Sequence, residues 1–115
     1  MSQFLLGVYH DPGVQQSGTA YQSEEAMQAS FAQVEAFNKK LIDDGHFVYA
    51  CGLTPPESAQ VVNPDATITA GPAVSGDKML GGFWVIEASS PEVAVALAEQ
   101  GAAACGQPVE LRPMQ

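Results

Sequence analysis

The clearest candidate for acid–base chemistry in this sequence is a histidine followed by a carboxylate. His10 and Asp11 stand at the end of a strand-like segment, directly before Pro12-Gly13. An imidazole assisted by a carboxylate can accept and return protons near neutral pH. Because adjacent strand residues point to opposite faces, a turn must intervene before the two side chains can meet. The alternative is structural, with Asp11 starting a turn and His10 exposed beside it.

The other histidine and the two cysteines do not suggest a metal site. His46 follows the predicted end of a helix, where a positive charge suits the helix dipole. Cys51 and Cys105 lack companions at metal-ligand spacing, so we expect two reduced thiols that pack as small apolar side chains. The sequence therefore predicts neither a metal nor a cofactor.

A group of apolar and aromatic side chains is suited to stacking a ring-shaped ligand in a cleft. Its members are Tyr9, Tyr49, Met79, Phe83 and Trp84. The competing interpretation is that they form the core and a subunit interface. Gly81-Gly82, before Phe83, is not a phosphate-binding loop, since no lysine and hydroxyl residue follow in the required order.

Length and charge narrow the classes of protein and partner. A chain of 115 residues fits one domain, here residues 1–115, with enough surface buried to form a single core. Thirteen acidic and four basic residues give a net charge of −9, which argues against nucleic acid and anionic membranes as partners. No apolar stretch is long enough to cross a membrane, and we expect no secretory leader. A cytoplasmic location is expected.

Two helices are predicted from caps and periodicity. Ser23 caps the first, which ends near Gly45, and Ser90-Pro91-Glu92 begins the second, which is expected to stop at Gly101. The apolar face of the first helix is predicted to carry five side chains spaced three or four apart: Met27, Phe31, Val34, Phe37 and Leu41.

Alternating apolar residues predict strands at 3–10, 46–53, 81–87 and 109–112, with a short hairpin formed by 59–63 and 67–69 and a loop at 14–22. The order β-α-β, hairpin insert, β-α-β predicts an α+β ferredoxin-like fold, with an antiparallel sheet and both helices on one face. If the other face is apolar it needs a cover, and a second copy would supply one. We therefore expect a homodimer.

Four segments resemble the YCII-related, DGPF-type proteins: Gly52-Leu53-Thr54-Pro55-Pro56, Ala70-Gly71-Pro72-Ala73, residues 80–87 and residues 108–113. The resemblance covers nearly the whole chain. It implies a dimeric α+β barrel, in which two ferredoxin-like protomers pack sheet against sheet and leave a cleft for small molecules. It also implies kinship with enzymes of small aromatic or lactone-like molecules that use a histidine–aspartate pair. For other proteins of this type, the resemblance implies a regulatory role.

The sequence departs from the family pattern at several polar positions. Ala70 and Ala73 replace the Asp and Phe of the Asp-Gly-Pro-Phe motif, and Thr54 stands where relatives often have histidine. The loop at 74–78 also lacks the usual acidic pattern. Two functions remain open. One is binding or transforming a small ring-shaped molecule in a cleft at the dimer sheet face, with His10 and Asp11 as the acid–base pair. The other is a non-enzymatic regulatory or protein-interaction module, which includes a paralogue that has lost activity.

Overall fold

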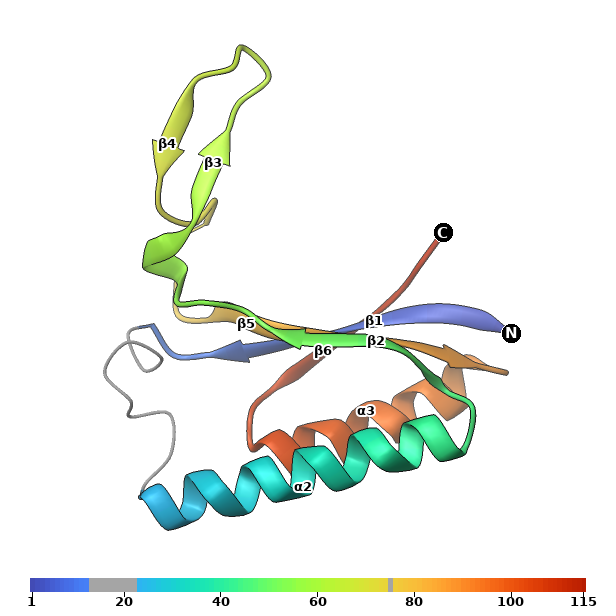
Figure 1. The fold of residues 1–115 in the computed structure, drawn as a ribbon. Coiled ribbons are helices and arrows are strands. Elements are labelled where there is room, and N and C mark those ends of the chain that lie inside the picture. The colour runs from blue at the N-terminus through green and yellow to red at the C-terminus, as the bar shows by residue number, and fades with distance from the viewer. Residues whose placement is uncertain (13–22, 75) are drawn as a thin grey trace.

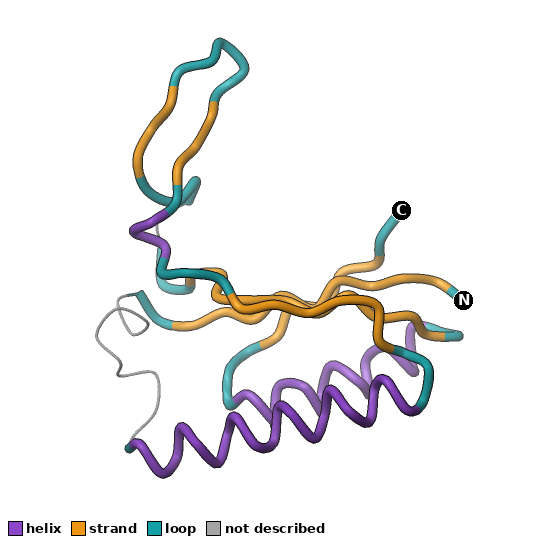
Figure 2. Tube along the Cα trace, in the orientation of Figure 1, coloured by secondary structure: helices purple, strands orange, loops and turns teal. Residues whose placement is uncertain are grey.

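The computed structural model describes residues 1–12, 23–74 and 76–115, so the predicted loop at 14–22 lies outside the described residues. Figures 1 and 2 show a sheet with two helices beneath it and a hairpin standing above it. The elements are β1 (Ser2–His10), α2 (Glu24–Asp43), β2 (Phe47–Gly52), the 3-10 turn η1 (Pro56–Ser58), β3 (Gln60–Val62), β4 (Ile68–Ala70), β5 (Met79–Ala88), α3 (Pro91–Cys105) and β6 (Val109–Pro113).

The main sheet has the strand order β2-β5-β1-β6, and each neighbouring pair is antiparallel. Both helices cover one face of it (Figure 1). This arrangement confirms the predicted ferredoxin-like α+β fold. The hairpin β3–β4, which we call the arm, projects from the opposite side and pairs with no other strand in the described part of the chain. Neither helix combines the length and the hydropathy that a membrane crossing requires.

Helix α2 begins and ends where its caps predict. The Ser23 hydroxyl accepts a hydrogen bond from the Ala26 amide at 3.0 Å, and Gly45 follows the helix with φ of 80°. The predicted apolar face is wrong at one position, since the Phe31 side chain is 57% exposed. Ser30 is buried in its place, because its hydroxyl donates to the Ala104 carbonyl of α3 at 2.9 Å.

Helix α3 begins at its Ser90 cap but does not stop at Gly101. It continues to Cys105 and ends at Gly106, which has φ of 71°. Gly101 is instead a packing residue: a Cβ added there would lie 3.2 Å from Cε2 of Phe37. Its missing side chain lets the two helices approach each other closely.

The core lies between the helices and the covered face of the sheet. Trp84 of β5 packs edge-on against Phe37 of α2, with ring centroids 5.3 Å apart, and its indole N–H donates to Asn38 at 2.6 Å. The other large buried side chains are Phe4, Leu6, Leu41, Ile86 and Leu97. The core is therefore built from α2, α3 and the central strands.

A β-bulge resets the faces of β5. Val8 pairs with Gly82 and Tyr9 pairs with Leu80, so Gly81 is the extra residue. Because paired residues of an antiparallel sheet share a face, Leu80 joins Tyr9 on the uncovered side, while Met79 pairs with His10 on the helix side. The bulge thus decides which residues reach the open face.

Candidate functional site

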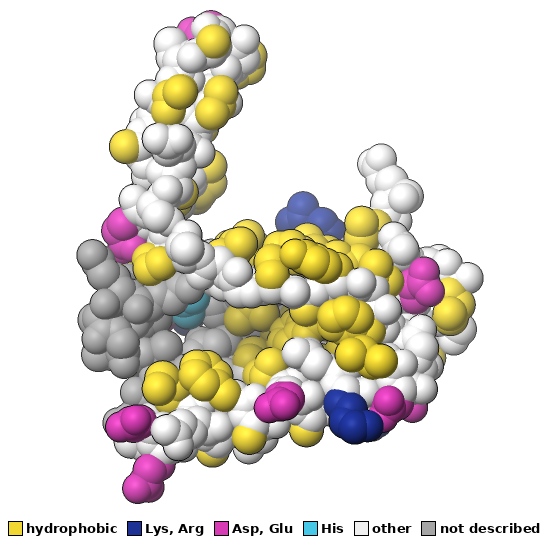
Figure 3. All heavy atoms as spheres, in the orientation of Figure 1, with side chains coloured by type: hydrophobic (Ala, Val, Ile, Leu, Met, Phe, Trp, Pro, Cys, Tyr) yellow, Lys and Arg dark blue, Asp and Glu magenta, His cyan; other side chains and the backbone are white. Residues whose placement is uncertain are grey.

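The face of the sheet opposite α2 and α3, which we call the open face, is mainly apolar at its centre. By register its apolar members are Leu5, Tyr9, Tyr49, Cys51, Leu80, Phe83 and Val85. The polar residues on this face are Gln3 and Glu87, which hydrogen-bond to each other at 3.3 Å, and Glu110 and Arg112 of β6. Figure 3 shows hydrophobic side chains gathered along this side of the sheet. The rings of Tyr49 and Phe83 contact each other with centroids 6.1 Å apart. Such a surface resembles one that a partner or a ligand covers.

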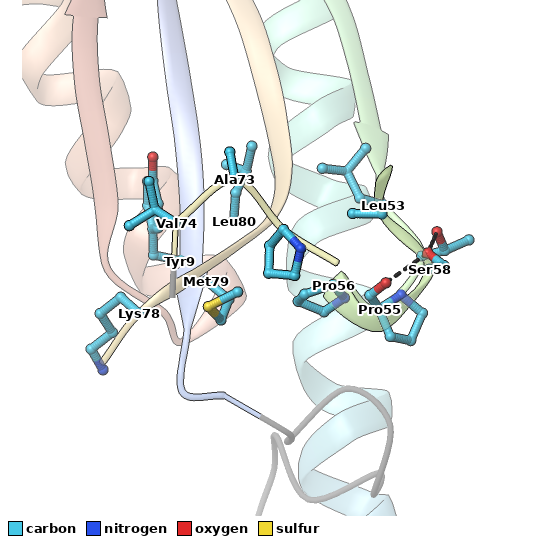
Figure 4. A pocket seen from close by; sticks show the side chains of 13 residues that line it. Tyr9, Leu53, Pro55, Pro56, Ser58, Ala73, Val74, Lys78, Met79 and Leu80 are labelled. Atoms are coloured by element: carbon cyan, nitrogen blue, oxygen red, sulfur yellow. Dashed lines mark hydrogen bonds between the residues drawn. The ribbon is translucent and has the colours of Figure 1, made fainter. Parts of the chain in front are cut away.

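A pocket of about 630 Å³ lies where the open face meets the foot of the arm (Figure 4). It is formed by the end of β1, the turn after β2, the loop after β4 and the start of β5. The described lining residues are Tyr9, Leu53, Thr54, Pro55, Pro56, Ser58, Ala59, Pro72, Ala73, Val74, Lys78, Met79 and Leu80. Most of these side chains are apolar, as is typical of small-molecule sites.

Backbone hydrogen bonds hold the walls of the pocket together. The Leu53 amide donates to the Gly81 carbonyl at 2.9 Å and so ties the turn after β2 to the bulge. The Gly71 amide donates to the Ala59 carbonyl at 2.7 Å and joins the two sides of the arm's foot. Gly71 has φ of 98°, a conformation that side chains disfavour, so glycine is required for this closure.

Tyr9 is placed against the sheet by a second glycine. A Cβ added to Gly7 would lie 3.3 Å from Cε1 of Tyr9 and 3.4 Å from Cδ1 of Leu80. The Tyr9 ring therefore extends over the bare backbone of Gly7, beside Leu80. This contact fixes one apolar wall of the pocket.

His10 and Asp11 lie next to the pocket but do not pair through the carboxylate. The imidazole is buried, and its Nδ1–H donates to the backbone carbonyl of Asp11 at 2.9 Å. The Asp11 carboxylate instead accepts from the Lys78 ammonium at 2.7 Å. This hydrogen bond and the charge of Lys78 lower the pKa of the Asp11 carboxyl below its usual value. Neither His10 nor Asp11 is among the described lining residues.

The other predicted ligand-binding residues are divided among three places. Tyr9 and Met79 line the pocket, whereas Tyr49 and Phe83 contact each other on the open face outside its described lining. Trp84 is 5% exposed and belongs to the core, because its register places it on the helix-covered face. We leave it out of the candidate site.

The remaining polar candidates have local structural partners. His46 Nδ1–H donates to the Glu87 carbonyl at 2.7 Å, which joins β2 to the end of β5. Cys51 and Cys105 form no disulfide with each other, and burial raises the pKa of the Cys105 thiol. Within the described residues, no three His, Cys, Asp or Glu side chains come together as a metal would need.

Sequence reasoning missed most of the pocket, including its charged residue Lys78. A signal was present, however: Pro55-Pro56 and Gly71-Pro72 bracket the predicted hairpin. Because the two ends of a hairpin must meet, the residues around both turns necessarily converge at its foot. These turn residues could therefore have been predicted to form a common site.

Comparison with known families agrees with this fold. The YCII-related domain matches residues 2–112, which is almost the whole chain. No protein with curated annotation matches the sequence. The resemblance to the YCII-related proteins is thereby confirmed, and the chain belongs to the YCII-related domain family.

Proposed function

We propose that this protein binds a small, ring-shaped molecule in the pocket at the foot of the arm. The observation that carries the proposal is the pocket's size and lining. Its volume of about 630 Å³ falls within the range of roughly 300–1,000 Å³ that is typical of small-molecule sites. Leu53, Leu80 and the Tyr9 ring supply apolar surface, and only a few polar groups accompany them.

Apolar contact alone would give weak binding. Burying about 150 Å² of a ring yields about 4 kcal/mol at roughly 25 cal/mol per Å². That corresponds to a Kd of about 1 mM before the entropy of association is subtracted. A useful affinity therefore needs directed polar contacts or a better closed pocket.

A second copy of the chain would improve the closure, and we include a homodimer in the proposal. The open face presents Leu5, Phe83 and Val85 beside the pocket, on the side of the sheet that neither α2 nor α3 covers. Two such faces can cover each other about a twofold axis. We also propose a cytoplasmic location, because Cys51, a thiol on this face that forms no disulfide, stays reduced there.

Binding is better supported by the geometry than turnover. Asp11, with its lowered pKa, is a weak base, and its charge already serves Lys78. Acid–base catalysis by His10 and Asp11 stays a prediction. It requires that a His10→Ala variant keep its fold and its ligand affinity while losing turnover, and unchanged turnover would contradict it.

The binding proposal is tested by filling the pocket. Ala73 lines it, and Ala103 is exposed on α3 away from it. We expect wild-type protein and Ala103→Trp to bind the neutral probe 4-ethylphenol equally, and Ala73→Trp to bind it about tenfold more weakly, as lost ring contact implies. Titration calorimetry measures the three affinities. Equal binding by Ala73→Trp would contradict the proposal.

A further inference from the structure

The two ends of the pocket offer different polar groups. In Figure 4, Lys78 lies at one end and Ser58 at the other, with apolar side chains between them. Thr54, which contacts Ser58, belongs to that second end. The chemistry of each end can be derived from its hydrogen bonds.

The Thr54 hydroxyl presents an acceptor. Ser58 has one hydroxyl hydrogen, and it donates this to the Pro55 carbonyl at 2.7 Å, since a carbonyl can only accept. The Thr54 and Ser58 oxygens are 2.6 Å apart, so in this contact Thr54 must be the donor. With its hydrogen committed, the Thr54 oxygen offers only lone pairs to the pocket. A ligand group placed there must donate a hydrogen bond.

Lys78 gives the other end a positive charge. It is the one charged side chain among the lining residues that the structure describes. Its ammonium donates to Asp11 at 2.7 Å, and within the described part of the chain two of its three hydrogens remain for other acceptors. In a chain with four basic and thirteen acidic residues, Lys78 is one of the few cations that an anionic group can contact, although it shares its charge with Asp11. An anionic ligand group is best accommodated here.

We propose that the pocket selects a ring that carries an anionic group at one end and a hydrogen-bond donor at the other. Lys78 binds the anion and the Thr54 oxygen accepts from the donor. An aromatic acid with a distant hydroxyl has this chemistry. The inference rests on the proposed binding function and specifies the ligand class for the same pocket.

Three probes with one flexible skeleton test it: 3-(4-hydroxyphenyl)propionate, its methyl ester and its 4-methoxy ether. The ester lacks the anion, and the ether lacks the donor. We expect wild-type protein to bind the hydroxy acid about tenfold more tightly than either analogue, because each lost contact involves a charge or an unmatched polar atom. Titration calorimetry at low salt measures each affinity, and thermal melts check that each variant folds.

Variants assign each preference to its residue. Lys78→Met should remove the preference for the hydroxy acid over its ester. Asp11→Asn should tighten the binding of the hydroxy acid, because it removes the carboxylate that competes for Lys78. Thr54→Val should erase the preference over the ether, whereas Thr54→Ser should keep it. Ser58→Ala frees the Thr54 hydrogen, so the ether should then bind nearly as well as the acid.

The outcomes separate this inference from the proposed function. If wild-type protein binds all three probes equally, or binds 4-ethylphenol but none of the three, the selectivity is overturned and the binding function stands. If neither 4-ethylphenol nor any of the three binds, both fail together. Preferences that survive Lys78→Met and Thr54→Val overturn the assignment to these residues.

Discussion

The position of His10 depends on a glycine rather than on its acidic neighbour. A Cβ added to Gly81 would overlap Cδ2 of His10 and lie 2.7 Å from its Nε2. The imidazole therefore lies directly over the backbone of the bulge. The bulge that brings Leu80 to the pocket also makes room for this ring.

Replacing Gly81 by alanine should disturb this packing. The added methyl group must displace a buried imidazole, so we expect Gly81→Ala to lower the free energy of unfolding by about 1–3 kcal/mol. Gly52→Ala is the matched control, since nothing lies within 4 Å of its added Cβ. Urea denaturation measures both variants. Equal stability of the two would contradict the placement of His10.

Single residues were only partly predictable from the sequence. The adjacency of His10 and Asp11 was visible, as was the geometric difficulty of pairing their side chains. The actual partner of Asp11, Lys78, lies 67 residues away and becomes its neighbour only through the antiparallel pairing of β1 and β5. Long-range contacts of this kind are absent from local sequence patterns.

Among the elements, the arm depends most on its own turn. A hairpin of two strands is marginally stable alone, so contacts within the turn matter. The Asp65 carboxylate accepts from the Thr67 amide at 3.0 Å and from the Thr67 hydroxyl at 2.7 Å. Between them, Ala66 adopts φ of 73°, which a side chain disfavours. The carboxylate therefore holds a strained turn closed.

The turn should loosen in acid. The Thr67 hydroxyl and amide bonds lower the pKa of Asp65 below its usual value of 3.8, since both favour the ionised form. Their contribution to the stability of the turn is complete above pH 3.8 and is lost as the pH falls through the lower pKa of the folded state. The NMR chemical shift of the Thr67 amide should change as the Asp65 carboxyl titrates, and this change should be absent in Asp65→Asn. A midpoint at or above 3.8 would contradict the contact.

At the scale of elements, prediction succeeded where the signal was local. Ser23 and Ser90 mark helix starts because their hydroxyls bond amides three residues away. Gly101 misled because a glycine can stay within a helix when a neighbour, here Phe37, needs the space. Phe31 misled because Ser30, whose hydroxyl donates to the Ala104 carbonyl, takes the buried position beside it. Tertiary packing overrides propensity at such positions.

The whole molecule is more extended than a compact domain. Its radius of gyration is 15.3 Å, against roughly 13 Å for a compact chain of this length. The arm contributes to this extension, because it stands clear of the two layers (Figure 1). The arm and the open face together form a concave corner that a second copy could fill.

We expect light scattering to give a mass of twice 12.0 kDa at micromolar concentration. Tyr49 is 56% exposed on the open face, so Tyr49→Glu should yield a folded monomer by placing a charge in the interface. Val95, 46% exposed on α3, provides the control, and Val95→Glu should remain a dimer. A wild-type monomer would remove the second copy from the account.

The most direct test of the account locates a bound ligand on the molecule. Titration of ¹⁵N-labelled protein with 4-ethylphenol should give saturable amide shifts that cluster at the pocket, around Tyr9, Thr54 and Leu80, and leave the solvent-facing side of α3 unchanged. Shifts that do not saturate, or that centre on the helices, would contradict the claim that the pocket at the foot of the arm is the binding site.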